Sequence, residues 1–540
     1  MPVGFPGRPQ KRVTTKDAKH TKTMSNEMAR KYREGTSRQE SMSGAAIEWH
    51  PIPGQFVVRF RASRVFRRSP SGAIVTVLLL LLAMADGAAG GDWLTHRGNT
   101  QRTGAADELP GPKAPKVLWV HKTREHFIAA PVPGGKEVYL SSLGAFNTSR
   151  FDALAVEPAT EKRIAWSKSA PFLKLPVVCA PALSGGKLVF GDGMHQTDGA
   201  ILHCVDAAEG LPIWELAIPG KLVHLEGAPT IFEDKVYIGG GNAGVLCVDL
   251  NRVTLDGKEQ ELAAVRKLLE AKWKELVAAY DKEKKVDPDF AIPPSEDALP
   301  RPVPKVVWQT GRDQWHVDAG VAVSAGRVFA ASAYLDDEKI GERALVCLDA
   351  ADGKPIWKRP LALNPWGGAT LAGDLALVAC SSIRFDPKKI PGATGEIVAV
   401  RIADGSVAWQ KPVPGGVVSS VAVGGPLAVF TATDGTVRAY EVASGSERWT
   451  YPGRTPLFAG VAIAGGVVYA ADLAGVVHAL HLASGPKVWT LDLARDPAVM
   501  APGNVYGSPA VQGGRLFVAT CNLDATGEKA GTVVVCIGEK

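Results

Sequence analysis

Cysteine is scarce in this chain, and its placement excludes several kinds of site. The 540 residues include seven cysteines, with no two adjacent, no Cys-x-x-Cys pair and no Cys-x-x-Cys-His haem signature. An odd number excludes complete internal disulfide pairing, and the spacing fits no metal site. We therefore expect the cysteines to be small buried side chains.

A long apolar run is also missing, since a membrane span takes about 20 such residues. The longest run, residues 73–85, lies between a basic stretch and several small residues. This order is typical of a signal peptide, which we place at residues 64–90, with an uncleaved anchor as the alternative. We expect an exported chain, in the periplasm or cell envelope or secreted, that does not span a membrane after cleavage. The sequence near the cleavage site has no cysteine to carry a lipid.

Positive charge is concentrated near the N-terminus. The sequence has 61 Lys and Arg against 55 Asp and Glu, a net charge of +6, but residues 1–70 alone have fifteen against five. The rest is therefore mildly acidic, at about −4, and carries no basic stripe. We predict no nucleic-acid partner. The polar, aperiodic residues 1–63 indicate a disordered leader or a translation start that lies further downstream.

Tryptophan marks an internal repeat. A small residue is followed by an acidic or polar residue at the third position, glycine at the seventh and tryptophan at the eleventh, as in Cys204 to Trp214 and Ala439 to Trp449. A looser copy opens at Ala155. A period of about 40–50 residues is typical of propellers, and Gly-containing turns divide each period into four short strands. The closing tryptophans, which we expect to pack between blades, are Trp119, Trp166, Trp214, Trp308, Trp357, Trp409, Trp449 and Trp489.

Two interrupted copies define the ring. The C-terminal residues 534–538 open a copy that lacks a tryptophan, and Trp119 near the other end supplies it. The N- and C-terminal strands therefore share one blade, which closes the sheet edges. The predicted fold class is all-β: an eight-bladed β-propeller of four-stranded blades over residues 91–540, with one inserted α-helix.

The inserted helix lies in the other interrupted copy, at residues 251–304. Apolar residues recur there at three- and four-residue steps over residues 257–285, which predicts an amphipathic helix. Its apolar stripe either packs on the propeller or docks a partner. The stripe consists of Leu262, Val265, Leu269, Trp273, Leu276 and Tyr280.

Alignment of the innermost strands places polar and aromatic side chains at the mouth of the central channel. His224 and Glu226 precede one such strand, and His316 and Asp318 precede the next. These four groups could ligate a divalent metal, bind a polar ligand, or only be hydrated. The candidate mouth residues are His126, His224, Glu226, His316, Asp318, Trp366, Phe458 and Tyr506.

The loops between second and third strands must share the face of these residues, because the first strand leaves that face and the second returns to it. Long loops on one face often carry function. We predict that this face binds a protein partner or a small polar ligand. The long loops are residues 141–150, 192–199, 332–343, 381–395 and 522–531.

The repeat with its closing tryptophan resembles the tryptophan-docking repeat of the PQQ-type, quinoprotein alcohol dehydrogenase-like propellers. Residues 92–104, DWLTHRGNTQRTG, are similar to the opening segment of such proteins. The resemblance covers nearly all of residues 92–540, but a fold does not fix its chemistry. One branch of the family, the quinoprotein dehydrogenases, holds PQQ and Ca²⁺ in the central funnel. Another consists of non-catalytic docking platforms, such as the outer-membrane barrel assembly lipoprotein.

The sequence departs from the dehydrogenase branch. It lacks the family's adjacent Cys-Cys pair and a haem domain, and no motif places the Ca²⁺ ligands or catalytic acids. We therefore expect no catalytic residues and no cofactor, and a monomeric binding or protein-interaction scaffold in the periplasm or cell envelope. The alternative is a PQQ-dependent dehydrogenase that holds PQQ with Ca²⁺ and oxidises an alcohol or sugar at the funnel.

Overall fold

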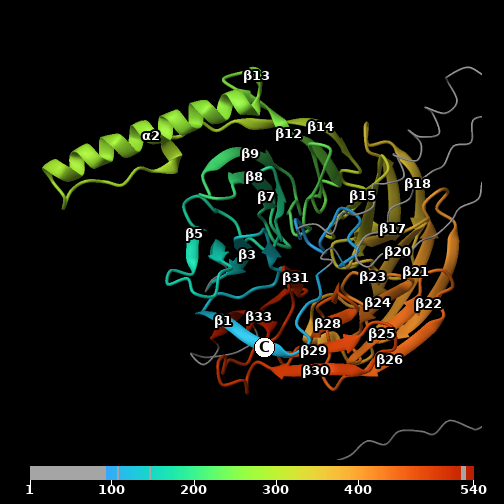
Figure 1. The fold of residues 1–540 in the computed structure, drawn as a ribbon. Helices are drawn as coiled ribbons and strands as arrows, with labels where there is room; N and C mark the ends of the chain where they lie inside the picture. Colours follow the sequence, from blue (N-terminus) through green and yellow to red (C-terminus); the bar gives the residue numbers. More distant parts are fainter. Residues whose placement is uncertain (1–92, 106–108, 145–147, 524–530) are drawn as a thin grey trace, which may run out of the picture. The chain divides into compact units, whose positions relative to one another are not determined.

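Eight antiparallel β-sheets follow one another around a central axis as the blades of a propeller (Figure 1). The computed structural model describes residues 93–105, 109–144, 148–523 and 531–540. The expected leader and signal peptide lie outside these residues. Seven blades have four strands and one has five. The eight-bladed, mostly β architecture predicted from the repeat is confirmed.

The blades are numbered in chain order, and six of them are formed by consecutive four-stranded meanders. Blade 1 is β2 (Val132–Pro133), β3 (Glu137–Leu143), β4 (Ser149–Ala155) and β5 (Ile164–Lys168). Blade 2 is β6 (Ala182–Ser184), β7 (Lys187–Gly191), β8 (Ala200–Asp206) and β9 (Pro212–Ile218). Blade 4 is β15 (Ala322–Ser324), β16 (Arg327–Leu335), β17 (Ile340–Asp349) and β18 (Pro355–Pro360).

The remaining meanders follow in the second half of the chain. Blade 5 is β19 (Ala369–Ala372), β20 (Leu375–Ser381), β21 (Thr394–Arg401) and β22 (Val407–Pro414), with the 3₁₀ turn η3 (Pro387–Lys389) in one loop. Blade 6 is β23 (Ala422–Gly424), β24 (Leu427–Thr431), β25 (Thr436–Glu441) and β26 (Glu447–Pro452). Blade 7 is β27 (Ala462–Ala464), β28 (Val467–Ala471), β29 (Val476–His481) and β30 (Lys487–Asp492).

Blade 8 joins the two ends of the chain. It contains β31 (Ala510–Gln512), β32 (Arg515–Ala519), β33 (Thr532–Glu539) and, from the N-terminal side, β1 (Pro115–Thr123). β1 pairs antiparallel with β33, and Trp119 lies opposite Cys536. The predicted closure of the ring is confirmed.

The small residue of each repeat lies opposite the closing tryptophan. Cys204 pairs with Trp214, and a register shift follows the pair. In blade 1, Trp166 lies opposite Ala153, so the prediction that this copy opens at Ala155 was wrong by two residues. A bulky residue in this position would meet the indole across the ladder, which explains the alternation of Cys and Ala there.

Each closing indole N–H donates a hydrogen bond to a carbonyl of the following blade or of the segment that leads into it. Trp409 donates to the carbonyl of Val442 at 2.8 Å. The indole ring also covers the repeat glycine of that blade: a Cβ on Gly445, whose φ is 66°, would lie 2.6 Å from the ring of Trp409. The eight donors are Trp119, Trp166, Trp214, Trp308, Trp357, Trp409, Trp449 and Trp489.

The hydrophobic core is divided among the blade interfaces. One cluster joins Tyr139 and Phe151 of blade 1 to Leu188 and Phe190 of blade 2. The seven cysteines are buried in such clusters or beside them. Because each blade is hydrophobic on both faces, its stability depends on its two neighbours.

Blade 3 carries the insertion. Its strands are β10 (Thr230–Phe232), β11 (Lys235–Gly239), the long β12 (Val245–Leu255) and β14 (Val303–Thr310), with β13 (Lys258–Glu261) paired to the outer end of β12. Helix α2 (Leu262–Val286) follows, then the 3₁₀ turn η2 (Glu296–Ala298). The helix begins five residues later than predicted, because residues 258–261 pair with β12.

Only the first half of α2 packs on the propeller. Leu262, Val265 and Leu269 are buried in a cluster with residues of blades 2 and 3, and Trp273 and Leu276 are partly buried there. Tyr280 lies beyond this cluster and is half-buried under Lys284. In Figure 1 the helix extends outward from β12 and β13. None of the helices in the described residues is long and apolar enough to cross a membrane.

Candidate functional site

The channel mouth is built from the segments that lead into the innermost strands. His224 and Glu226 lie between β9 and β10, and His316 and Asp318 lie between β14 and β15. The backbone of His316 is fixed by a bridge to Ala333 of β16. These short connections enter the strands in fixed register, so the four side chains come together on one face.

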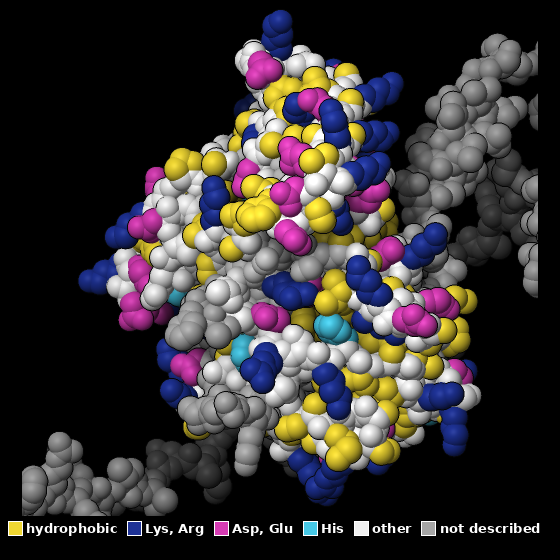
Figure 2. Space-filling view, turned by 90° about the vertical axis from the view of Figure 1, so that its left-hand side faces the viewer, with side chains coloured by type: hydrophobic (Ala, Val, Ile, Leu, Met, Phe, Trp, Pro, Cys, Tyr) yellow, Lys and Arg dark blue, Asp and Glu magenta, His cyan; other side chains and the backbone are white. Residues whose placement is uncertain are grey.

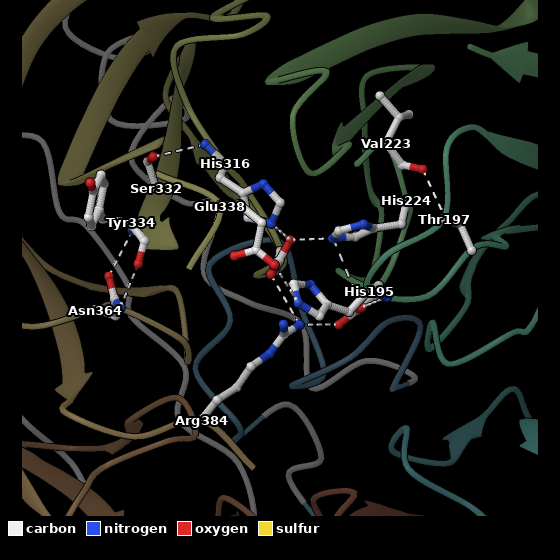
Figure 3. Close-up of polar contacts among 12 residues, drawn as sticks. His195, Thr197, Val223, His224, His316, Ser332, Tyr334, Glu338, Asn364 and Arg384 are labelled. Carbon is white, nitrogen blue, oxygen red and sulfur yellow. Dashed lines mark hydrogen bonds and ion pairs between the residues drawn. The ribbon is translucent and has the colours of Figure 1, made fainter. Parts of the chain in front are cut away.

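Asp318 is the centre of this group. Figure 3 shows the imidazoles of His224 and His316 directed toward each other. Oδ1 of Asp318 lies 2.8 Å from Nε2 of His224 and 3.0 Å from Nε2 of His316. Glu226 lies further away, with 4.0 Å between its Oε1 and the same nitrogen of His224. Both imidazoles are completely buried. The structure therefore brings together the four residues for which the sequence suggested a metal or polar ligand.

Three long loops add side chains that the sequence did not predict as part of the site. His195 comes from the β7–β8 loop, Glu338 from the β16–β17 hairpin and Arg384 from the β20–β21 loop. Arg384 Nη2 lies 2.5 Å from Glu226 and 3.1 Å from Asp318, and His195 lies 3.8 Å from Glu338. Loop length identified the region, but no pattern singled out these residues.

The β7–β8 loop is fixed to the mouth by its backbone. The backbone N–H of His195 donates to Glu226, and that of Leu222 donates to Asp198 at 2.9 Å. The backbone N–H of Leu225 donates to the carbonyl of Asp192 at 3.0 Å. Because the loop follows residues 222–226 along their length, the ring of His195 is held beside that of His224, at 5.8 Å between ring centroids.

The other predicted mouth residues lie in three different places. Trp366 and Tyr506 line the funnel, and Arg384 stacks on Trp366 at 5.0 Å. Phe458 is completely buried beneath Tyr506, with 5.5 Å between ring centroids. His126 is not part of the histidine group: its Nδ1 accepts a hydrogen bond from the backbone of Asn522.

The charged groups at the centre of the mouth shift one another's pKa values. Burial raises the pKa of Asp318, but the neighbouring His316, His224 and Arg384 outweigh it and hold that pKa well below the usual range. Burial lowers the pKa of His224, and the Asp318 carboxylate reverses the effect so that the net shift is upward. For His195, burial and then Arg384 lower the pKa.

The opposite end of the channel is closed by the N-terminal segment. Residues 93–105 run through the centre of the ring (Figure 1), and their carbonyls accept hydrogen bonds from inner-strand residues of five blades. Arg102 is completely buried there and donates to the carbonyls of Ala228 at 2.7 Å and Val321 at 3.1 Å. The funnel above this plug has a volume of about 160 Å³ and is lined by His96 at its floor and Arg384 at its mouth.

Fold and site together define an eight-bladed propeller of the PQQ-like type with a polar, histidine-rich mouth. The family model described as outer membrane protein assembly factor BamB matches residues 109–277, 303–382 and 366–525. The chain belongs to this family. No curated protein sequence matches it.

Solved structures with this fold come from both branches of the superfamily. BamB from Moraxella catarrhalis is 15% identical with a TM-score of 0.50, covering 78% of this chain and 97% of its own. A europium-containing methanol dehydrogenase is 13% identical with a TM-score of 0.55, covering 83% and 98%. The quinohemoprotein alcohol dehydrogenase of Comamonas testosteroni is 15% identical with a TM-score of 0.54, covering 85% and 82%. At such identities the likeness is one of fold alone.

Proposed function

We propose that this chain is an exported, non-catalytic propeller of the cell envelope whose long-loop face binds a partner. The observation that carries this proposal is that side chains of the protein itself already fill much of the funnel mouth. Arg384 crosses it and pairs with Glu226 and Asp318, and the remaining cavity is about 160 Å³. Pockets for small organic ligands usually have about 300–1,000 Å³. Family membership and the expected signal peptide support the envelope location.

The chemistry of the mouth does not fit PQQ with Ca²⁺. PQQ is a three-ring tricarboxylate, and its carboxylates would meet Glu226 and Asp318 with one arginine between them that is already paired. Ca²⁺ takes six to eight oxygen ligands, whereas imidazole nitrogens surround Asp318. These observations favour a docking surface over a quinoprotein site.

The insertion supplies a second candidate surface. Beyond the packed half of α2, Val286, Phe290 and Ile292 are 83%, 81% and 78% exposed. In Figure 2, hydrophobic side chains lie among charged ones on the upper part of the molecule, where α2 is found. Clustered apolar exposure of this kind is typical of protein interaction sites.

Cross-linking in envelope extracts tests both surfaces. The wild-type chain is compared with Arg384→Gln on the loop face and with the double variant Phe290→Ser, Ile292→Ser on the insertion. Ile356→Ser, at a 43% exposed position on a blade flank, is the matched control. We expect the control to retain a partner that at least one test variant loses. Equal capture by all variants would contradict the proposal, as would dye-linked oxidation of an alcohol or sugar after addition of PQQ and Ca²⁺.

A further inference from the structure

Three histidines from three separate blades meet at the channel mouth. One ring nitrogen from each of His195, His224 and His316 lies within 4.8 Å of the other two. The imidazoles of His224 and His316 are completely buried, and that of His195 is 30% exposed. Imidazole nitrogen is the donor preferred by Zn²⁺ and related divalent transition metals.

The hydrogen bonding of these imidazoles is incomplete. In the part of the chain that the structure describes, Nδ1 of all three is buried without a hydrogen-bond partner, and so is Nε2 of His316. That Nε2 lies 3.0 Å from Asp318, an ion-pair distance, but the geometry is not that of a hydrogen bond. More than 90% of buried polar groups are normally paired, and the unpaired Nε2 of His316 is the nitrogen that lies beside Asp318. An unpaired nitrogen at this position indicates a missing ligand.

The charge around the histidines also favours a cation. Asp318, Glu226 and Glu338 contribute three negative charges within 4 Å of the histidines, and Arg384 contributes one positive charge. With neutral imidazoles, the net charge of about −2 matches a divalent ion. Arg384 contacts Oδ2 of Asp318, which leaves Oδ1 directed at both buried imidazoles.

We propose that the channel mouth is a Zn²⁺ site in which His195, His224 and His316 supply three nitrogens and Asp318 supplies one carboxylate oxygen. A tetrahedral site with bonds of 2.0–2.1 Å places its ligand atoms roughly 3.3 Å apart. The distances from Asp318 to His224 and His316, 2.8 and 3.0 Å, are already close to this value.

Closure of the site needs a small movement of one side chain. The backbone of His195 is fixed by Glu226, but its side chain is 30% exposed, so rotation of the side chain brings its ring toward the two buried ones. Binding displaces the proton that His224 shares with Asp318 in the hydrogen bond between them. Glu226 holds the loop through the backbone of His195, which positions this residue without using its ring.

The Zn²⁺ site does not rest on the proposed partner function, because metal content is measured on the isolated protein. A chain that binds Zn²⁺ but captures no partner would leave this inference intact and overturn the other. A chain that captures a partner but binds no Zn²⁺ would overturn this inference and leave the proposed function intact.

The test uses the full chain without a histidine tag. It is dialysed against buffered Zn²⁺ with a competing chelator, and the bound metal is measured by mass spectrometry. We expect about one Zn²⁺ per chain. His195→Ala and His316→Gln should each weaken binding at least about 100-fold, since even residues that only orient ligands contribute 10–100-fold. His126→Ala, on the same face but bonded to Asn522, is the control and should bind like the wild type.

Two results would overturn the inference: no Zn²⁺ retained by the wild type, or wild-type affinity in both ligand variants. Should His316→Gln fail to fold, as judged by circular dichroism, His195→Ala decides alone because its side chain is not part of the core. Co²⁺ in place of Zn²⁺ should give the intense visible absorption of a tetrahedral site. A weak octahedral spectrum would contradict the assignment of four protein ligands.

Discussion

The repeat glycine next to each closing tryptophan gives the sharpest test of how the blades are held together. Gly445 has a φ of 66° and is covered by Trp409 of the preceding blade, with 2.6 Å between a Cβ built on the glycine and the indole ring. Gly425, in the same blade, has a φ of 57° but no atom within 4 Å of such a Cβ. The two positions share the backbone strain and differ in the tryptophan contact.

The expected losses of unfolding free energy follow from these two terms. Alanine at a left-handed position costs about 1–2 kcal/mol, and this is the whole cost at Gly425. At Gly445 the methyl group also displaces a ring anchored by its hydrogen bond to Val442, and overpacking adds about 1–3 kcal/mol. We expect Gly445→Ala to lose about 2–5 kcal/mol and Gly425→Ala about 1–2 kcal/mol. The effect of alanine on the unfolded chain is the same in both and cancels.

Chemical denaturation followed by circular dichroism measures these losses. In a Trp409→Leu background the clash is removed, so the additional cost of Gly445→Ala should fall to that of Gly425→Ala. Such coupling between neighbouring residues is what a double-mutant cycle detects. Equal losses at the two glycines, or an unchanged cost in the Trp409→Leu background, would refute the role assigned to the tryptophan.

Three further predictions concern buried groups. All seven cysteines are buried, and burial raises the pKa of Cys179 to about 12. Alkylation at pH 8 should therefore modify none of them in the native protein and all seven after unfolding. Rapid labelling of the native protein would contradict the packing. His203 is buried between Asp192 and Glu215, each 3.2 Å away. Burial lowers its pKa, but these carboxylates reverse the effect and raise it, so its stabilisation is complete below about pH 6.5 and lost as pH rises through the folded pKa. His203→Gln should lower the free energy of unfolding by about 3–5 kcal/mol at pH 5.5 and by less at pH 9. A pH-independent loss in denaturant titrations would disprove a positive charge on His203. Arg102→Met leaves inner-strand carbonyls unpaired, which costs about 1–3 kcal/mol of stability for each carbonyl, so Tm should fall. The control Arg495→Met, at a position that is 87% exposed, should leave Tm unchanged.

Short-range sequence signals determined the architecture. The spacing from Cys204 to Trp214 is a property of one hairpin, so each blade is encoded within its own repeat. The unpaired copy at residues 534–538 and the isolated Trp119 located the ring closure before any tertiary contact was known. The helix was also predictable, but its start was not, because residues 258–261 form a pairing that extends a strand beyond its blade.

The channel mouth was predictable only in part. His224 and His316 follow the strand register, so aligning the repeats placed them together. Arg384 and His195 lie in loops whose path depends on contacts with other blades, and those contacts have no sequence period.

The sequence by itself therefore determined the ring, its closure and the face on which the long loops and the mouth residues lie, because these depend on local pairing repeated eight times. Only the tertiary structure decided which side chains meet there and how they are charged. Their distances depend on loops from blades 2, 4 and 5 that converge across the axis. Convergence of this kind has no local signature, and it is what turns a repeated scaffold into a particular site.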